Sequence, residues 1–166
     1  MHIQPLEVDV YPATIEILTE TFGPFFEVYA RPHLGERVFQ HQHGHWEQDY
    51  REEAPTLHAP EAGRNAAVAT QTDDTIAGLI SWRVDAKARH GEIYLLAVSP
   101  RHRRRHVGTS ARRPPLCEHA MAQMRSAEVE VVQIGTGGDP FNAPARALYE
   151  RLGFTQVPVA VYLGAI

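Results

Sequence analysis

The sequence predicts a single α/β domain, and three observations support this fold class. The chain has 166 residues, a length that suits one compact domain. With 43% hydrophobic and 22% charged residues, it has the composition of a globular protein that buries a core. Apolar runs alternate with helical patterns in the order β-α-α-β-β-β-α-β-α-β, and the centre is rich in hairpins. We therefore expect one domain over residues 1–166.

Composition excludes several other classes of protein. No apolar run approaches the ~18 residues that a membrane-spanning helix needs. The first twenty residues carry acidic side chains where a signal peptide would carry Lys or Arg. Cys117 is the single cysteine, which excludes an internal disulfide and a cysteine-based zinc site. We expect a cytoplasmic protein without a membrane partner.

The N-terminal segment is expected to form a strand and then a helix. Residues 2–8 have the pattern of a first strand. Pro12 suits the first turn of the helix that follows, and Asp9 is a plausible N-cap. The dipeptide Gly23-Pro24 should end this helix, because both residues interrupt helical hydrogen bonding.

A second helical stretch and a group of strands come next. Residues 36–53 are polar but helical in pattern, with an interruption at Gly44, and the Pro- and Ala-rich residues 54–64 predict a loop. Alternating or continuous apolar runs then predict four strands at residues 66–71, 75–84, 91–98 and 128–135. The first two of these should form a hairpin.

Helices are expected between and after the last strands. One helical stretch follows an arginine-rich turn and ends near Ser126. Pro114 and Pro115 interrupt it, so it is either kinked or restarts with Pro115 in its first turn. Another helix should cover residues 144–152, and residues 154–163 have the pattern of a final strand.

Charge is unevenly distributed along the chain. Residues 1–64 carry eleven acidic side chains against four arginines, whereas residues 65–166 carry nine against twelve basic ones. Such segregation attracts cations to one part of the surface and anions to the other. The basic residues cluster around Arg101 to Arg105, where they either serve an anion site or form an ordinary solvated patch.

A strand, a short basic turn and a helix follow one another between Leu96 and Thr109. The helix is expected to begin near His106. In this arrangement the unpaired N–H groups and the positive end of the helix dipole converge on one point, which favours a pyrophosphate. Flanking arginines add positive charge. A strand–turn–helix alone is a weak signal, since many α/β proteins contain one.

Two motifs sharpen this interpretation. The segment from Asn142 to Phe154 resembles the N-x-x-A-x-x-L-Y-x-x-x-G-F signature of the GNAT superfamily of acetyl-CoA-dependent N-acetyltransferases. The upstream turn resembles the V-x-P-x-x-R-x-x-G-x-G/A motif of the same superfamily, with matches at four positions: Val98, Pro100, Arg103 and Gly108. His106 departs from it, since it stands where the first glycine is usual. The resemblance covers about residues 65–166.

The resemblance implies a mixed, mostly antiparallel sheet of six to seven strands with splayed central strands, flanked by about four helices. It implies acetyl-CoA as cosubstrate, bound by residues 65–166, with residues 1–64 on the acceptor side. The residues expected to contact the cofactor are Leu96, Ala97, Val98, Arg103, Arg104, Arg105, His106, Val107, Gly108, Thr109, Asn142, Ala145 and Tyr149. A backbone amide near Val98 would polarise the thioester carbonyl.

Two residues are expected to handle protons. Tyr149 matches the family's general acid, which faces the sulfur of CoA; the alternative is a core aromatic on an amphipathic helix. Glu92 stands where many family members place a base; the alternative is an ordinary charged strand end. Cys117 is expected to be a small buried hydrophobe.

The acceptor is expected to be a small amine. An acidic pocket would favour a cation, and an aminoglycoside-like antibiotic is the most specific hypothesis, which would make the protein an antibiotic-resistance enzyme. The alternative is that these acidic residues only solubilise the surface. The side chains expected to contact the acceptor are His41, Trp46, Tyr50 and Trp82.

Other functions were weighed against this one. His41, His43 and His45 alternate, but alternating positions face apart on a helix, so no metal site is expected. Overall acidity argues against nucleic acid as a partner. A catalytically silent CoA-binding module, motivated by His106, and a peptide or protein N-acetyltransferase remain as alternatives. The resemblance also implies a possible homodimer.

Overall fold

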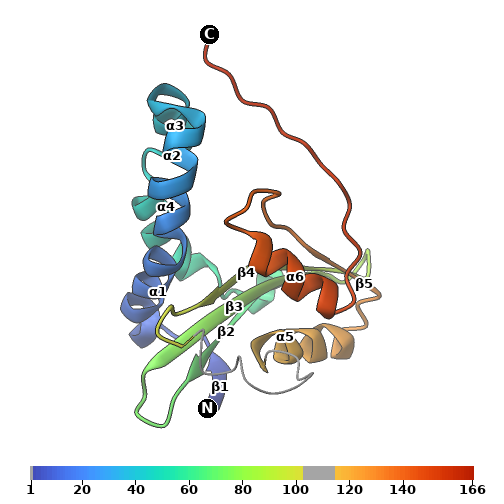
Figure 1. Cartoon of the computed structure of the whole chain (residues 1–166). Helices are drawn as coiled ribbons and strands as arrows, with labels where there is room; N and C mark the ends of the chain where they lie inside the picture. The colour runs from blue at the N-terminus through green and yellow to red at the C-terminus, as the bar shows by residue number, and fades with distance from the viewer. Residues whose placement is uncertain (1, 103–114) are drawn as a thin grey trace.

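The structure, a computed structural model of the chain, describes residues 2–102 and 115–166 (Figure 1). One sheet runs in the order β1-β2-β3-β4-β5. Its strands are β1 (His2–Pro5), β2 (Arg64–Thr70), β3 (Ile76–Asp85), β4 (His90–Val98) and β5 (Val131–Ile134). Neighbours are antiparallel except β4 and β5, which are parallel. The mixed α/β class is confirmed, with five strands in the described residues rather than six or seven.

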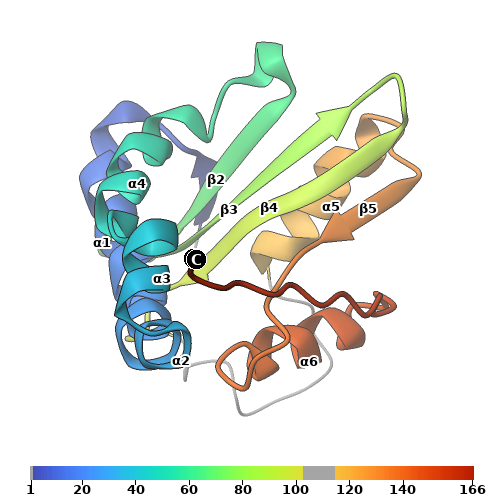
Figure 2. The same cartoon turned by 90° about the horizontal axis from the view of Figure 1, so that it is seen from above.

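Helices cover both sides of this sheet. The α-helices are α1 (Tyr11–Pro24), α2 (Arg31–Leu34), α3 (Glu36–His43), α4 (Trp46–Glu53), α5 (Pro115–Ser126) and α6 (Ala143–Arg151). Shorter turns are η1 (Val8–Val10), η2 (Phe25–Ala30), η3 (Ala54–Thr56) and η4 (Pro60–Ala62). Figure 2 shows α1 to α4 on one side of the molecule and α5 and α6 on the other. Among the described residues, no helix has both the length and the apolar character needed to cross a membrane.

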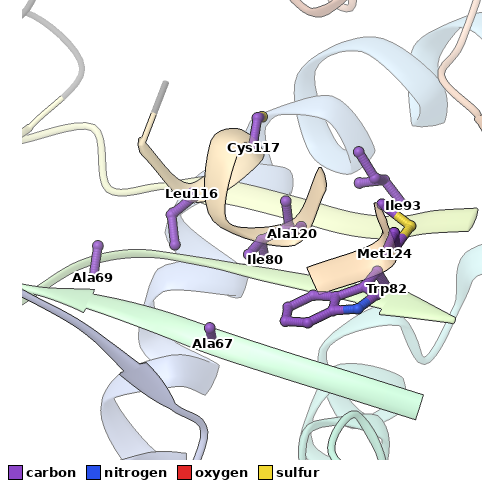
Figure 3. Packing of buried hydrophobic residues seen from close by; sticks show 9 residues of the cluster. All are labelled: Ala67, Ala69, Ile80, Trp82, Ile93, Leu116, Cys117, Ala120 and Met124. Carbon is purple, nitrogen blue, oxygen red and sulfur yellow. The ribbon is translucent and has the colours of Figure 1, made fainter. Parts of the chain in front are cut away.

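The face of the sheet under α5 carries one apolar core. Ile80 and Ile93 point from the strands toward Ala120 and Met124 of α5, with Trp82 beside them (Figure 3). A side chain at position 91 would place its Cβ 2.5 Å from the sulfur of Met124. A larger residue at position 91 would therefore push the Met124 side chain out of its present place between α5 and β4. Burial of apolar surface in this core contributes about 25 cal/mol per Å² removed from water.

The opposite face carries the core of the N-terminal half. Leu18 of α1 packs against Val68 and Leu79 of the sheet, and all three side chains are fully buried. A smaller cluster around Phe39 and Trp46 joins α3 and α4 to the helix before them. Apolar residues recur along these helices at a spacing that puts them on one face, and that face packs toward the sheet.

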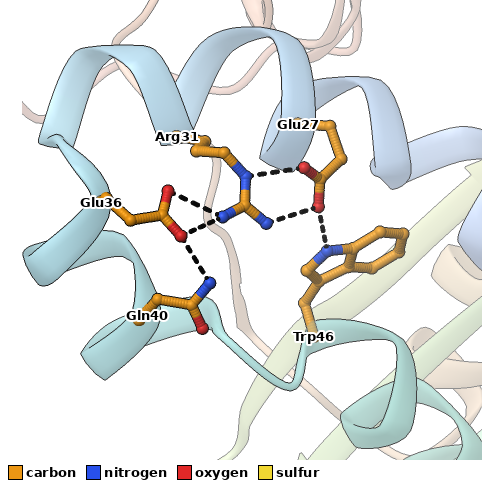
Figure 4. A network of polar contacts seen from close by, with 5 residues as sticks. All are labelled: Glu27, Arg31, Glu36, Gln40 and Trp46. Atoms are coloured by element: carbon orange, nitrogen blue, oxygen red, sulfur yellow. Dashed lines mark hydrogen bonds and ion pairs between the residues drawn. The ribbon is translucent and has the colours of Figure 1, made fainter.

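A polar network fixes the outer helices relative to one another. The guanidinium of Arg31 donates hydrogen bonds to the carboxylates of Glu27 and Glu36, and the indole N–H of Trp46 donates to Glu27 at 2.9 Å (Figure 4). The hydrogen bonds from Arg31 and Trp46 hold the pKa of Glu27 below its ordinary value. These ion pairs are exposed and stabilise little by themselves, so their role is to orient the helices.

Two expectations for the first helix were wrong. The N-cap position is Val10 rather than Asp9, and its side chain makes no capping hydrogen bond. Gly23-Pro24 does not end the helical path, because α1 continues directly into the π-helical turn η2 and then α2. A π-turn shifts the hydrogen-bond ladder, which accommodates the N–H that Pro24 lacks. The path ends at Gly35, whose φ of +77° suits glycine.

The ends of the later elements are partly as expected. Pro115 begins α5, the first-turn position expected for it, whereas the helical stretch expected before it and Pro114 lie outside the described residues. The expected strand at residues 154–163 does not form. Pro158 has no N–H to donate to a neighbouring strand, and residues 155–166 are exposed throughout.

Candidate active site

The two parallel strands separate part-way along their length. β5 pairs with β4 only where Val131–Ile134 lie beside His90–Ile93. β4 continues to Val98 with β3 as its partner, while the chain after β5 turns away toward α6 (Figure 2). Along the rest of β4, alternate backbone N–H and C=O groups point away from β3. They face the space that opens between β4 and the chain leaving β5, which we call the wedge. The described residues place no strand there.

A β-bulge lies at the start of this wedge. Ser81 of β3 pairs with Leu95 and Trp82 pairs with Ile93, so Tyr94 is an extra residue on β4. As a result, Tyr94 and Leu95 both turn toward the N-terminal helices: the Tyr94 hydroxyl donates to Glu53, and Leu95 packs on the core under α1. Bulges redirect side chains in this way and are frequent beside active sites.

Glu92 lies two residues before the bulge and on the same face. Its carboxylate is 3.8 Å from the nearest guanidinium nitrogen of Arg83, and its side chain is about one-third exposed. The Arg83 guanidinium also lies 3.7 Å over the ring centre of Tyr94. Glu92 therefore sits where β4 and β5 still pair, next to the point at which they part.

The far end of β4 is fixed by contacts to neighbouring elements. The hydroxyl of Thr21 in α1 donates to the carbonyl of Val98 at 3.3 Å, and the N–H of Ser99 donates to Ala77. Ala97 is buried on the α1 side, and Leu96 packs toward the α5 core. The expected pyrophosphate residues Arg103 to Thr109 lie outside the described residues.

Tyr149 lies on α6 next to a hollow between α5 and α6. The hollow has a volume of about 170 Å³ and is lined by Cys117, Glu118, Met121, Arg125, Leu152 and Phe154. Burial raises the pKa of Tyr149 to about 12 and that of the Cys117 thiol to about 11. Both groups therefore stay protonated at neutral pH. The phenol can donate a proton, and the thiol behaves as a small hydrophobe.

The loop before α6 is held by its own polar contacts. The side-chain amide of Asn142 donates to the carboxylate of Asp139 at 2.8 Å. Arg146 donates to the carbonyls of Gly137 and Asp139 at 2.6 and 2.7 Å. A Cβ at Gly137 would lie 2.1 Å from a carboxylate oxygen of Asp139, so a larger residue there would displace that carboxylate. The Asn142 amide nitrogen is thus occupied within the loop, while Ala145 is half-buried on α6.

Of the four side chains expected at the acceptor, Trp46 and Tyr50 lie together, with ring centres 6.3 Å apart, whereas His41 and Trp82 lie elsewhere. Tyr50 stacks on Phe22 at 5.6 Å, and burial, followed by the charge of Glu53, raises its pKa. Trp46 is buried and hydrogen-bonded to Glu27, and His41 is exposed on α3. Trp82 lies in the core on the opposite face, 5.9 Å from the ring of His119. Its indole fills the space under α5, although its backbone adjoins the bulge, whereas Tyr50 lies on the same face of the sheet as the Tyr94 side chain.

Metal-ligating residues do not gather in the part of the chain that the structure describes. Within residues 2–102 and 115–166, no group of three His, Cys, Asp or Glu side chains is placed to hold a metal ion. His43 instead contributes its ring to the aromatic cluster, at 5.2 Å from Phe26 and 5.8 Å from Phe39.

Comparison with known proteins identifies the family. The model of the acetyltransferase (GNAT) family matches residues 16–154, which is most of the chain. The chain belongs to the GNAT family. The expected superfamily is thereby confirmed, and acetyl-CoA is the acyl donor that this family uses.

Individual relatives of this GNAT chain agree with that result. Mycothiol acetyltransferase from Beutenbergia cavernae is 40% identical over 81 residues, which are 49% of this chain and 24% of that protein. The chain thus matches about a quarter of the length of this relative. PaiA N-acetyltransferase from Thermoplasma acidophilum, solved with coenzyme A, has a TM-score of 0.62 at 16% identity, over 93% of this chain and 91% of that one.

A third similar structure is aminoglycoside 6'-acetyltransferase type Ii. It has a TM-score of 0.61 at 18% identity and covers 95% of this chain and 85% of its own. At such identities, the two structural similarities show the fold alone. They support the GNAT architecture but do not indicate which substrate this chain uses.

The residues present fit acetyl-CoA. The wedge beside β4 offers backbone groups that no described strand uses, and α6 has no fully buried side chain on either face. The hollow between α5 and α6 lies beside Tyr149 and is lined mainly by apolar side chains and the buried thiol. This combination of open strand edge and incompletely covered helix suits an elongated ligand with amide groups and an apolar end.

Several residues of this GNAT site were not expected from the sequence. Tyr94, Arg83 and Thr21 contact β4 or its bulge, and Arg146 folds the loop before α6. Arg146 falls at an unspecified position of the motif. The bulge at Tyr94 has no sequence signal, since residues 91–98 look like an uninterrupted strand.

Proposed function

We propose that this chain transfers an acetyl group from acetyl-CoA to the primary amine of a small molecule. The observation that carries the proposal is the wedge between β4 and β5, which has Glu92 on its acceptor side and Tyr149 on its cofactor side. The family membership supplies the reaction class, and this geometry supplies candidate groups for both proton transfers.

Acetyl-CoA supplies the activated acetyl group, and the amine of the acceptor forms the new C–N bond while the C–S bond breaks. The amine must first lose a proton from its ammonium form, and Glu92 accepts it directly or through water. The protonated phenol of Tyr149 donates a proton to the departing sulfur. A backbone N–H in the wedge polarises the carbonyl. Holding both partners in this geometry lowers the entropic part of the barrier.

A polycation such as an aminoglycoside is the most specific version of this proposal. Its support is the excess of acidic residues in positions 1–64. Much of that charge is compensated locally, however. Glu27 and Glu36 pair with Arg31, Glu47 pairs with Arg51, and Glu20 pairs with Arg101. We therefore commit to a small primary amine and treat polycations as one arm of the test.

The test is a screen for thiol release from acetyl-CoA with aminoglycosides, polyamines, amino acids and basic peptides as acceptors. We expect turnover with at least one small amine and a mono-acetylated product by mass spectrometry. Tight binding of acetyl-CoA by calorimetry without turnover on any amine would instead identify a silent CoA-binding module. For a polycationic acceptor, 0.5 M salt should raise KM, since screening weakens exposed charge pairs.

A further inference from the structure

A series of side-chain contacts links the end of α4 to Glu92, the proposed base. It runs from Glu53, the last residue of α4, through Tyr94 and Arg83 to the Glu92 carboxylate. Tyr94 and Glu92 lie on β4, and Arg83 lies on β3. The series therefore ties a helix of the N-terminal half to the group that is proposed to accept the proton.

Strand register places Arg83 beside Glu92. The two residues stand directly opposite each other on neighbouring antiparallel strands. Side chains at such paired positions share a face of the sheet and lie close enough to interact. The distance from the nearest guanidinium nitrogen of Arg83 to the Glu92 carboxylate is 3.8 Å. The carboxylate is therefore attracted toward β3 on the face that the N-terminal helices cover.

Tyr94 supports the Arg83 side chain from one side. The guanidinium carbon of Arg83 lies 3.7 Å from the centre of the Tyr94 ring. A planar guanidinium over an aromatic ring is attracted by the negative face of that ring, and the contact restricts its orientation. Because Arg83 is held over this ring, it presents its N–H groups to Glu92 from a fixed direction.

Glu53 in turn holds the Tyr94 ring. The Tyr94 hydroxyl donates a hydrogen bond to the Glu53 carboxylate, and such bonds to an ionised acceptor are stronger than those between neutral groups. Burial, followed by this hydrogen bond, raises the pKa of Tyr94 above its ordinary value, so the hydroxyl remains a donor at neutral pH. The ring is thus fixed at its hydroxyl end while its face supports Arg83.

The ion pair between Arg83 and Glu92 contributes little to folding stability. The side chains are 47% and 36% exposed, and ion pairs with this exposure stabilise folded proteins only weakly. An acceptor that covers this face would exclude water, and the pair would then become stronger because the local dielectric constant falls. The contact therefore matters most when an acceptor is bound.

We propose that Arg83 is a positioning residue for acetyl transfer: supported by Tyr94, it fixes the direction of the Glu92 carboxylate for removal of a proton from the acceptor. This rests on the proposed function, because it assigns the group that orients the base of that same site. The proton passes from the ammonium of the acceptor to Glu92. Arg83 stays protonated throughout and acts only through Glu92.

The first test is Arg83→Gln, assayed with the amine that gives the highest kcat/KM in the acceptor screen. We expect kcat to fall by about 10-fold and the KM for acetyl-CoA to stay within about 2-fold, since a misdirected base slows the chemistry alone. Tm should stay within about 2 °C of the wild type. Unchanged kcat would overturn the proposal. The control is Arg89→Gln, an exposed arginine paired with Glu130, which should leave kcat and KM unchanged.

The double variant Arg83→Gln/Glu92→Gln separates positioning from a structural role. If Arg83 acts through Glu92, its loss has no further effect once the carboxylate is gone. We therefore expect kcat of the double variant to lie within about 2-fold of that of Glu92→Gln alone. A further fall of about 10-fold would show that Arg83 acts independently of Glu92, and would overturn the proposal.

Two variants of Tyr94 test the support of Arg83. Tyr94→Phe keeps the ring and should leave kcat within about 3-fold of the wild type, whereas Tyr94→Leu removes the ring and should lower kcat by about 5- to 10-fold. Equal kcat in the two variants would contradict a role for the ring.

The failure of this proposal differs from failure of the proposed function. If the wild type acetylates an amine and Glu92→Gln lowers kcat while Arg83→Gln does not, only the positioning role is wrong. If the wild type binds acetyl-CoA but acetylates no amine of any class, the proposed function fails, and the role of Arg83 fails with it.

Discussion

The proposed acceptor side, residues 1–64, and the proposed cofactor side around α6 differ in how completely the protein itself fills them. On the acceptor side, Leu18 and Phe39 are fully buried, and a polar network around Arg31 fixes the outer helices. On the proposed cofactor side, α6 has only partly buried side chains, Tyr149 among them, and residues 155–166 are exposed. The N-terminal half thus packs through fully buried side chains, whereas α6 does not.

This difference indicates which side depends on a ligand. A preformed wall holds an acceptor without reorganising, and rigid sites lose little entropy on binding. The cofactor side gains contacts only when something occupies the wedge and the hollow beside Tyr149. We therefore expect acetyl-CoA to stabilise α6 and the acceptor wall to remain as it is.

The largest effect is expected from Tyr149→Phe. Loss of the proton donor should lower kcat by about 10²- to 10⁴-fold, with little change in the KM for acetyl-CoA. Thiol-release kinetics measure this. Burial raises the pKa of Tyr149 to about 12. At pH values under about 11, loss of the phenol proton should therefore not lower the wild-type rate. Tyr162→Phe, in the exposed tail, is the control, and full turnover in Tyr149→Phe would exclude the general acid.

Phe39→Ala tests the other side through stability. Removing this fully buried ring should lower the free energy of unfolding by about 3–5 kcal/mol, through lost transfer energy and a cavity. Denaturant titration measures it. Val159→Ala, in the exposed tail, should change stability by less than about 0.5 kcal/mol. Equal losses in both variants would contradict the contrast between the two sides.

Glu92→Gln should lower kcat by about 10²-fold at neutral pH, because the amide cannot accept a proton. The pH–rate profile of the variant should also differ from that of the wild type, because the variant has lost the base. An unchanged pH–rate profile would exclude Glu92 as the base. The control is Glu7→Gln, which removes an exposed carboxylate far from the wedge.

The smallest effect is expected from Arg146→Gln. It removes two hydrogen bonds to the loop carbonyls of Gly137 and Asp139. We expect the KM for acetyl-CoA to rise by about 3- to 10-fold while kcat changes little. Charge-assisted hydrogen bonds contribute about 1.5–3 kcal/mol, and the two made by Arg146 are partly exposed. Arg151→Gln, on the same helix and exposed, is the comparison. A fall in kcat alone would place Arg146 in the chemistry instead.

Local patterns predicted most of the fold. The hairpin of β2 and β3, the buried strand β4 and the helix boundary at Gly44 follow from alternation, continuous apolar runs and glycine. The final strand was wrong because its alternating pattern says nothing about whether a partner strand is available. The helix through Pro24 was wrong because a π-turn depends on the packing around it rather than on the residue itself.

The site was predicted unevenly, for a related reason. Glu92 lies on β4 where β5 still pairs with it, and Tyr149 lies on α6 near Cys117 and Phe154, in elements whose motifs or strand patterns are visible in the sequence; their roles stay predictions. Arg83 and Tyr94 meet only through strand register and a bulge, and neither leaves a mark in the residue order. Trp82 was expected to contact the acceptor, but its position on β3 directs its side chain into the core under α5.

Hydrogen exchange with and without acetyl-CoA tests the central claim most directly, because it asks whether the cofactor lies in the wedge between β4 and β5. The account predicts slower exchange at the amides of Leu95 and Leu96 and along α6, with no change around Phe39 in α3. Protection elsewhere, with those amides and α6 unaffected, would contradict it.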